Sequence, residues 1–378
     1  MPMHNGLLPR EGIYAAPIFK LIARTALNPS LLLPLVLLAR YTKRGHDLSI
    51  LHEKAFGRIK TLLYLGLART VARWLSDKTR NNWTNDRYDW SREIVVVTGG
   101  SSGIGGTVVK LFDELGIKVV VIDVQGMTYA TSSRVHYFKC DLRSPTAVNE
   151  VADKIRSQVG NPTVLINNAG VARGKTIMDA EPADVRFTFD VNTLSHYWIT
   201  KAFLPSMIRR NHGMIVTVAS QASWITAPVM VDYCASKAAA MAFHEGLSAE
   251  LKTVYNAPRV RTVAVHPAHT KTPLFNGFNQ HDNFMFPSLE VETMAEGIVK
   301  QVLTGRSGNV VLPETGNIVP LLRVVPDFIS YRMRSQGVKY MKTWNGKQVI
   351  ADISSSYEPA EKHNDTGDST VLVSGKGE

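Results

Sequence analysis

From residue 93 onward, short runs of β-branched residues alternate with stretches whose apolar residues recur at helical spacing. The run Ile94–Val97 is uninterrupted, as expected of a strand that is buried on both faces of a sheet. Apolar residues then recur every three or four positions from Ile104 to Leu115, and Gly116 ends that predicted helix. Further strands are expected at Val119–Ile122, Val135–Cys140, Val164–Ile166, Met214–Val218, Val260–Val265 and Val310–Leu312. This alternation predicts one α/β domain over residues 91–313, built on a doubly wound parallel sheet.

The first 90 residues follow a different pattern. Their most apolar stretch, Leu31–Ala39, is shorter than the roughly 20 apolar residues of a spanning helix, and Pro34 interrupts it. A second helix, apolar along one side, is expected over Leu62–Leu75. Apolar helices flanked by basic residues and tryptophans are typical of an anchor that lies in the membrane interface. Residues 1–90 are therefore predicted to form a helical, membrane-associated extension, the alternatives being a transmembrane span or packing on the protein's own core.

Composition and charge narrow the class of protein. The 378 residues are 44% hydrophobic and 20% charged, which excludes wholesale disorder. The net charge of +11 is uneven, because residues 1–90 carry +8, residues 91–350 carry +7 and residues 351–378 carry −4. No long basic stripe or nucleic-acid motif is present, so the basic excess favours a membrane surface rather than a nucleic acid as the partner. Residues 314–350 are expected to form an amphipathic C-terminal extension, and residues 351–378 a disordered tail.

The two cysteines indicate neither a disulfide framework nor a metal site. Cys140 and Cys234 are too few for a disulfide framework and are not spaced as zinc ligands. No metal site is therefore expected, and a reducing compartment or a cytosol-facing domain is favoured.

A glycine-rich segment follows the first predicted strand and opens the helix after it. Glycine lets backbone amides approach a pyrophosphate, and the helix N-terminus adds a partial positive charge. The spacing is Gly-x-x-x-Gly-x-Gly, and its place after an apolar strand predicts a dinucleotide site in a Rossmann fold. The residues of this loop expected to contact the cofactor are Thr98, Gly99, Ser101, Ser102, Gly103, Ile104 and Gly105.

Two aspartates end the next two strands. Asp123 ends the second strand, 18 residues after Gly105. A carboxylate there accepts hydrogen bonds from both ribose hydroxyls and repels a 2′-phosphate, which favours NAD as the cofactor, with NADP still possible. The alternative for Asp123 is a helix-capping or solvent-facing acid. Asp141 follows the third strand and is a candidate for holding the adenine amine, with a structural role about as well supported.

Two more motifs complete a recognisable set. Asn167-Asn168-Ala169-Gly170 follows the fourth predicted strand, and Tyr233-Cys234-Ala235-Ser236-Lys237 lies further on. With the glycine loop, in this order and spacing over residues 92–312, they resemble the short-chain dehydrogenase/reductase family. The resemblance implies that Tyr233 is the catalytic acid/base and that Lys237 assists it. It also implies that Ser220 binds the substrate oxygen and that Asn192 holds a water in a proton relay.

The resemblance extends to the cofactor contacts outside the glycine loop. These are Asp123, Asp141, Asn168, Ala169, Gly170, Lys201, Tyr233, Lys237, Pro267, Thr270 and Thr272. Two of the assignments have open alternatives: Ser223 could take the place of Ser220, and Lys201 could be an ordinary exposed helical lysine.

The chemistry of a tyrosine and a lysine supports these roles. Tyrosine has a reference pKa near 10, so a useful base needs roughly 3 units of lowering, or about 4 kcal/mol. Positions i and i+4 share one helix face, which brings Lys237 beside Tyr233. A positive charge about 4 Å away contributes about 4 kcal/mol at an effective dielectric near 20. Lys237 and an oxidised nicotinamide ring are together expected to supply the shift.

One position departs from the family pattern. After the sixth strand the family has Pro-Gly, whereas this chain has Pro267-Ala268-His269. Thr270 and Thr272 stand where contacts to the nicotinamide carboxamide are expected, but Ala268 puts the local backbone geometry in question. His269 is expected to be structural rather than catalytic.

The substrate is expected to be lipophilic. The segment after Thr272 corresponds to the family's variable loop over the substrate, and Trp224 and Met230 lie where substrate-facing residues occur in the family. The apolar residues of this loop are Leu274, Phe275, Phe278, Phe284, Met285 and Phe286. An apolar lid beside an interfacial N-terminus favours an alcohol or ketone that partitions into membranes, the alternative being that these residues only dock the loop.

The basic, apolar N-terminus also resembles the membrane-associated retinol and hydroxysteroid dehydrogenase branch of the family. This implies an NAD(P)-dependent enzyme that interconverts a retinoid, steroid or fatty alcohol and its aldehyde or ketone. It further implies the cytosolic face of the endoplasmic reticulum or a lipid droplet, and a homodimer formed through the helices at 192–207 and 233–253. Two alternatives stay open, an NADPH-dependent lipid-ketone reductase and a non-catalytic Rossmann binding or scaffold protein.

Overall fold

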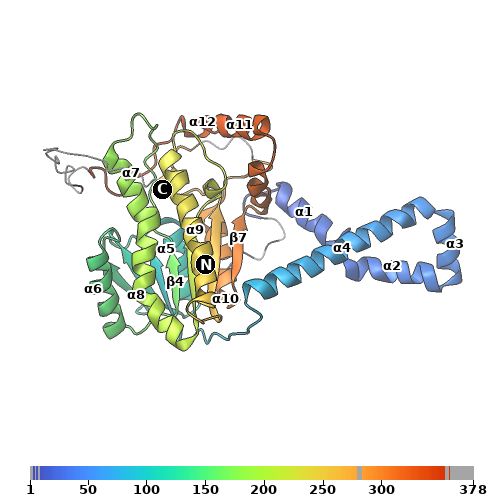
Figure 1. Ribbon diagram of the computed structural model, residues 1–378, viewed down its shortest axis with the longest axis horizontal. Coiled ribbons are helices and arrows are strands. Elements are labelled where there is room, and N and C mark those ends of the chain that lie inside the picture. The colour runs from blue at the N-terminus through green and yellow to red at the C-terminus, as the bar shows by residue number, and fades with distance from the viewer. Residues whose placement is uncertain (1–2, 5, 7–8, 279–282, 354–356, 358–378) are drawn as a thin grey trace, which may run out of the picture.

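Seven parallel strands form one sheet in the order β3-β2-β1-β4-β5-β6-β7 (Figure 1). The computed structural model describes residues 3–4, 6, 9–278, 283–353 and 357. The strands are β1 (Ile94–Thr98), β2 (Lys118–Asp123), β3 (Val135–Lys139), β4 (Val164–Asn167), β5 (Gly213–Val218), β6 (Val260–Pro267) and β7 (Gly308–Leu312). The predicted doubly wound α/β sheet is confirmed. Strand order reverses between β1 and β4, and such a switch point opens a crevice at the carboxyl ends of the strands.

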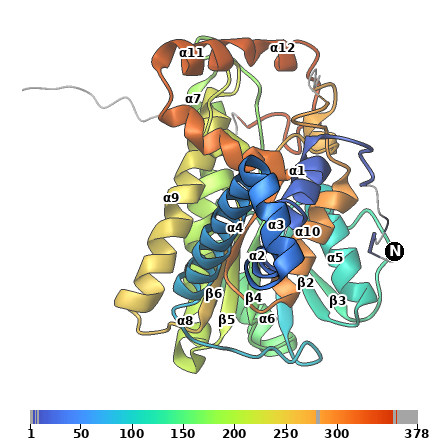
Figure 2. The same ribbon diagram turned by 90° about the vertical axis from the view of Figure 1, so that its right-hand side faces the viewer.

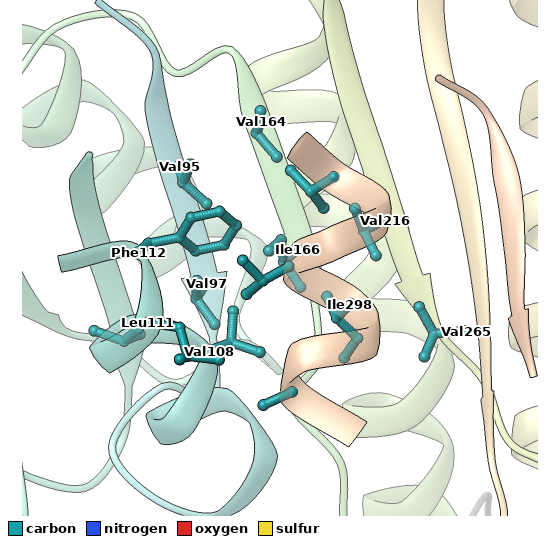
Figure 3. Close-up of a cluster of buried hydrophobic side chains, with 14 of the residues drawn as sticks. Val95, Val97, Val108, Leu111, Phe112, Val164, Ile166, Val216, Val265 and Ile298 are labelled. Atoms are coloured by element: carbon teal, nitrogen blue, oxygen red, sulfur yellow. The ribbon is translucent and has the colours of Figure 1, made fainter. Parts of the chain in front are cut away.

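Helices cover both faces of this sheet (Figure 2). On one face lie α5 (Gly103–Glu114) and α10 (Val291–Leu303), and on the other lie α6 (Pro145–Gln158), α8 (Ser195–Arg210) and α9 (Val231–Thr253). Figure 3 shows Phe112 of α5 and Ile298 of α10 in one cluster with Val95 and Val97. Val96, between these two valines, packs in the opposite cluster. Because successive side chains of a strand point to opposite faces, a strand covered on both sides has to be apolar throughout.

The N-terminal extension is helical, as predicted. It consists of α1 (Ala15–Arg24), α2 (Pro29–Tyr41), α3 (Lys43–Leu51) and α4 (Glu53–Arg80), and α2 to α4 project away from the sheet (Figure 1). Asn28 starts α2 by accepting a hydrogen bond from the Ser30 amide at 3.0 Å. The expected second helix lies within the longer α4.

Most of the extension has little contact with the protein core. The stretch Ala15–Tyr41, which comprises α1, α2 and the turn between them, is long and apolar enough to cross a membrane. Its most apolar 18-residue window has a mean hydropathy of 1.7 and is 6% buried. This N-terminal apolar segment is consistent with membrane anchoring.

The C-terminal extension passes over the carboxyl edge of the sheet. A 3₁₀ segment, η4 (Glu314–Arg323), follows β7 and leads to the helices α11 (Asp327–Gln336) and α12 (Val338–Met341), which lie above the sheet (Figure 1). The chain then returns across the same edge, where Trp344 donates to the Leu274 carbonyl and Gln348 donates to the Ala172 carbonyl. Of the tail predicted to be disordered, residues 354–356 and 358–378 lie outside the described residues.

Candidate active site

A cavity of about 630 Å³ opens at the carboxyl edge of the sheet. Its lining comes from the loops that follow β1 to β6, from the start of α9 and from the C-terminal extension. Among the described residues, Tyr233, Lys237, Ser220 and Asp123 all border it. Residues far apart in the sequence therefore meet where the topology predicts a binding crevice.

The glycine loop forms one end of the cavity. Gly99 has φ +64°, and a Cβ on it would lie 2.8 Å from the Ala169 Cα. A Cβ on Gly105 would lie 2.2 Å from the Gly99 carbonyl oxygen, so no larger residue fits there. Gly103 has φ +57° and borders open cavity space, with nothing nearer to its Cβ position than Thr272 at 3.7 Å. The bare backbone of this turn at the start of α5 fits a pyrophosphate.

Several predicted loop contacts lie behind this surface rather than on it. Gly99, Ser102, Gly103 and Ile104 line the cavity, whereas Thr98, Ser101 and Gly105 are not among its lining residues. The Thr98 hydroxyl accepts hydrogen bonds from the Asn168 and Ala169 amides at 3.0 and 3.1 Å. Thr98 therefore ties the glycine loop to the loop after β4, and Asn168, Ala169 and Gly170 of that loop line the cavity.

Asp123 sits at the end of β2 and is 9% exposed. One carboxylate oxygen accepts from the Ser101 amide and the other from the Gln125 amide, both at 3.0 Å. Each oxygen keeps a second lone pair for a further donor. The carboxylate is thus fixed beside the glycine loop with acceptor capacity left for ribose hydroxyls.

Asp141 has a strong protein partner. Arg143 binds its carboxylate through Nε and Nη2, at 2.9 and 2.7 Å. Burial acts to raise the pKa of Asp141, but the hydrogen bonds from Arg143 outweigh it and lower the pKa below its usual value. The guanidinium also lies over the rings of Phe187 and Tyr357. Asp141 borders the cavity, but most of its acceptor capacity is used by Arg143.

Tyr233 and Lys237 lie on the first turns of α9 and are 7% and 3% exposed. The Lys237 ammonium donates to the Val218 carbonyl at 2.9 Å and lies 5.9 Å from the centre of the Tyr233 ring. Burial lowers the pKa of Lys237 to about 8. Burial also raises the pKa of Tyr233, and a hydrogen bond with Ser220 acts in the opposite direction.

Lys237 and an oxidised nicotinamide together were expected to lower the pKa of Tyr233, whereas the side chains around the phenol raise it in this structure. The enclosure of the phenol has the larger effect, because desolvation disfavours the charged phenolate. The lowering that base catalysis needs therefore stays an expectation for the site with an oxidised, positively charged nicotinamide beside Lys237.

Ser220 begins a short turn after β5. Its hydroxyl donates to the Pro267 carbonyl at 3.3 Å and accepts from the Ala222 amide at 3.1 Å. The donor bond is long, so a better acceptor in the cavity can replace it. Ser223, the alternative, instead donates to the Ser220 carbonyl at 2.6 Å and does not line the cavity.

Asn192 lies in η1 (Asp190–Leu194), a π-helical segment that joins α7 (Pro182–Phe189) to α8. Its side-chain amide pairs with the Val171 backbone at 2.8 and 2.9 Å and donates to the Ser236 hydroxyl at 3.0 Å. A Cβ on Gly170 would lie 3.4 Å from the Lys237 Nζ and 3.5 Å from the Asn192 Oδ1. Asn192 is not among the residues that line the cavity, but its Oδ1 and the Lys237 Nζ both lie close to Gly170, which does line it.

Residues after β6 close the cavity on the other side. Pro267, Ala268, Thr270 and Thr272 all line it. The Ala268 amide donates to the Leu312 carbonyl at 2.9 Å, and Ala268 is not in the left-handed region, so alanine stands there without backbone strain. His269 is held by Ser288 at 2.8 Å and stacks on Phe278, and burial lowers its pKa to about 4.

Two further predicted contacts do not line the cavity. Lys201 is exposed on α8, while Thr200 before it is buried and bonds Asn167, so the helix turns the lysine away from the site. Trp224 stacks on His266, with ring centres 4.1 Å apart, and does not line the cavity. A short sequence distance from Ser220 therefore did not make Trp224 substrate-facing.

The substrate side of the cavity is apolar. Met230, Leu274, Phe275, Phe278 and Phe286 line it as expected, whereas Phe284 and Met285 do not. The C-terminal extension contributes wall residues that sequence reasoning missed, among them Val319, Leu322, Met333, Tyr340, Lys347 and Ile350. No motif marks them; the only available signal was the amphipathic pattern of residues 314–350.

Comparisons with known proteins agree with this geometry. The family described as short chain dehydrogenase matches residues 93–283. Dehydrogenase RED2 of Cochliobolus heterostrophus is 46% identical over 208 residues, which cover 54% of this chain and 78% of that protein. Human epidermal retinol dehydrogenase 2 is 36% identical over 226 residues, covering 57% and 73%.

A solved structure of a short chain dehydrogenase also aligns with this chain. A short chain dehydrogenase from Burkholderia cenocepacia J2315 in complex with NADP aligns with a TM-score of 0.55 and 25% identity, covering 64% of this chain and 96% of that one. The glycine turn, the buried Tyr233–Lys237 pair and these matches together identify this chain as a member of the short-chain dehydrogenase/reductase family, an NAD(P)-dependent oxidoreductase that acts on CH–OH groups.

Proposed function

We propose that this enzyme oxidises a lipophilic alcohol, of the retinoid, steroid or fatty alcohol class, with NAD. The observation that carries the proposal is the arrangement of one cavity in which Tyr233 and Ser220 face a wall made mostly of aromatic and aliphatic side chains. Such a wall favours a large apolar substrate with a single polar group to be oriented. The name of the retinol dehydrogenase relative points to the same class of substrate.

The roles of the side chains follow from their contacts. Ser220 exchanges its long bond to the Pro267 carbonyl for a hydrogen bond to the substrate oxygen. The Tyr233 phenolate takes the alcohol proton, and the buried Lys237 ammonium holds positive charge near it. Asn192 holds a water in the proton relay, and its side-chain amide is fixed by the Val171 backbone and the Ser236 hydroxyl. The nicotinamide, when bound, accepts the hydride.

The preference for NAD is supported by Asp123. Its carboxylate is fixed by two backbone amides at the end of β2. A second negative charge on a ribose 2′-phosphate would be brought next to this carboxylate and repelled. With an NAD preference, cellular conditions favour oxidation of the alcohol.

The location and assembly are also part of the proposal. The exposed apolar N-terminal stretch supports attachment to the cytosolic face of the endoplasmic reticulum or a lipid droplet. A homodimer through α8 and α9 is supported by Tyr197, which is exposed on α8. Light scattering of the detergent-solubilised protein gives its mass and tests the dimer.

The test of the catalytic assignment is Tyr233→Phe. This variant keeps the ring packing and removes only the hydroxyl, so we expect turnover of retinoid, steroid and fatty alcohols to be abolished while NADH binding, measured by fluorescence, is retained. Lys201→Met is the matched control, because that lysine is exposed outside the cavity, and its turnover should stay normal. Normal turnover by the Tyr233→Phe enzyme would refute the assignment.

A further inference from the structure

The C-terminal extension carries a set of exposed apolar side chains, which we call the outer apolar patch. It consists of Ile318, Leu321, Val324, Phe328, Ile329, Tyr331 and Met333. Val324 is 79% exposed and Phe328 is 76% exposed, so the fold leaves both side chains almost entirely in water. Grouped apolar exposure on this scale marks a surface that binds something apolar.

The outer apolar patch is the other side of the cavity wall. In the same segments, Val319, Leu322 and Met333 line the cavity. The Arg323 guanidinium donates to the Trp224 and Ser223 carbonyls, at 2.9 and 3.1 Å, which holds η4 against the turn that follows β5. One layer of chain therefore separates the substrate space from the exposed apolar surface.

The C-terminal extension, which carries the patch, lies beside the N-terminal helix α1. Figure 1 shows α1 beside the C-terminal extension, on the side from which α2 to α4 project. Lys20 of α1 lies 3.5 Å from Glu314 of η4. The exposed apolar residues of α1 are Ile18, Phe19, Leu21 and Ile22. The extension that carries the patch thus lies against the stretch that is long and apolar enough to enter a membrane.

The charge of this region favours an anionic partner. Residues 314–350 contain six basic residues and two acidic ones, so they supply +4 of the +7 carried by residues 91–350. Of the six, Arg332, Lys339 and Lys342 are exposed, whereas Arg323 is bonded to the turn after β5, and Arg334 and Lys347 line the cavity. Exposed apolar side chains with basic ones near them in the chain match the boundary between acyl chains and anionic headgroups. A second copy of this chain would instead bring basic residues against basic residues.

We propose that the outer apolar patch docks on an anionic lipid bilayer and holds the mouth of the cavity against it, so that a lipophilic substrate enters from the bilayer without crossing water. The identity of the substrate that enters rests on the proposed function. The docking does not, because it follows from the exposure of the outer apolar patch, the charge of residues 314–350 and their position next to α1.

A fluorescent label tests the docking without any turnover. Val324→Cys in the full chain is labelled with an environment-sensitive dye, since Cys140 and Cys234 are buried. On vesicles of phosphatidylcholine and phosphatidylserine, dye emission should rise roughly threefold or more and be quenched by nitroxide-labelled lipid. The control is Val254→Cys, a 67% exposed valine at the far end of α9, whose emission should not change. Protein that binds the vesicles while its dye at position 324 stays unquenched would overturn the proposal. A rise in dye emission without lipid, caused by self-association of the protein, would overturn it as well.

A kinetic experiment tests substrate entry. The double variant Leu321→Asp, Phe328→Asp alters the patch but no residue that lines the cavity. We expect kcat/KM for a long-chain alcohol presented in vesicles to fall roughly tenfold or more, with kcat/KM for a short water-soluble alcohol unchanged. Equal kcat/KM values for the vesicle-borne alcohol in variant and parent would refute entry from the bilayer. If the parent oxidises no alcohol, the proposed function fails, while the dye measurement still decides the docking.

Discussion

Replacing Asp123 by serine is expected to move the cofactor preference from NAD towards NADP. The carboxylate is 9% exposed and accepts one backbone hydrogen bond on each oxygen, from Ser101 and Gln125. It is therefore a rigid negative charge at the place where the adenosine ribose of either cofactor is expected. Serine removes that charge, and its shorter side chain has one hydroxyl oxygen in place of the two carboxylate oxygens.

Two effects determine the size of the change. A hydrogen bond to a charged group contributes about 1.5–3 kcal/mol, so losing one ribose bond weakens NAD by roughly 10- to 150-fold. A 2′-phosphate about 5 Å from the carboxylate is repelled by about 3 kcal/mol per charge pair at an effective dielectric near 20, and serine abolishes this repulsion. With screening by solvent, the ratio of kcat/KM for NAD to that for NADP should fall roughly 10²- to 10⁴-fold.

The assay measures kcat/KM for both cofactors with one alcohol, in the parent enzyme, Asp123→Ser and Asp123→Asn. The asparagine variant keeps the side-chain shape and removes the charge, so it separates the repulsion from the lost ribose bond. Serine also leaves at least one of the two backbone amides without its acceptor, which costs about 1–3 kcal/mol of stability. Thermal unfolding therefore accompanies the kinetics. An NADP preference in the parent enzyme, or an unchanged ratio in a folded serine variant, would refute the reasoning.

Three further predictions concern the glycine loop and the amino edge of the sheet, opposite the cavity. Gly105→Ala places a Cβ 2.2 Å from a backbone oxygen of the glycine loop, and NADH affinity measured by fluorescence titration should fall roughly tenfold or more. Arg261→Met removes a guanidinium that is 1% exposed and donates to three backbone carbonyls, so the midpoint of thermal unfolding should drop by several degrees, for a loss of about 2–4 kcal/mol. His212 binds Glu93 and Asp86, which raise its pKa, so its stabilising effect is full below about pH 6.5 and is lost as pH rises through the raised value. Urea unfolding should show this loss in the parent and not in His212→Gln.

The fold could be predicted because its signals are local. Every predicted strand is present. The clearest signals come from β1, β2 and β4, because a parallel strand covered on both faces requires an apolar run that is visible in a few residues. The Tyr233–Lys237 pair was predictable for the same reason, because four positions along a helix bring two side chains to one face. The positions of Gly99 and Gly105 also follow from local backbone demands.

The assignments of Lys201 and Asp141 could not be settled from the sequence, because they depend on contacts with residues that are distant in the chain. The sequence placed Lys201 at the cofactor, but the face of α8 that meets the sheet is set by Thr200 and Asn167, 33 residues apart. Asp141 was a candidate for the adenine, yet its carboxylate binds Arg143, whose guanidinium also contacts Tyr357 from the far end of the chain.

The sequence alone determined the strand and helix pattern, the glycine turn, the tyrosine–lysine pair and the apolar character of the N-terminus, because each is a property of residues close together in the chain. Only the tertiary structure decided which side chains border the cavity and that residues of the C-terminal extension form its outer wall. That wall is built from contacts between residues about 100 positions apart, such as Arg323 with Ser223 and Trp224. Such contacts depend on how whole elements pack, and no short-range periodicity encodes them.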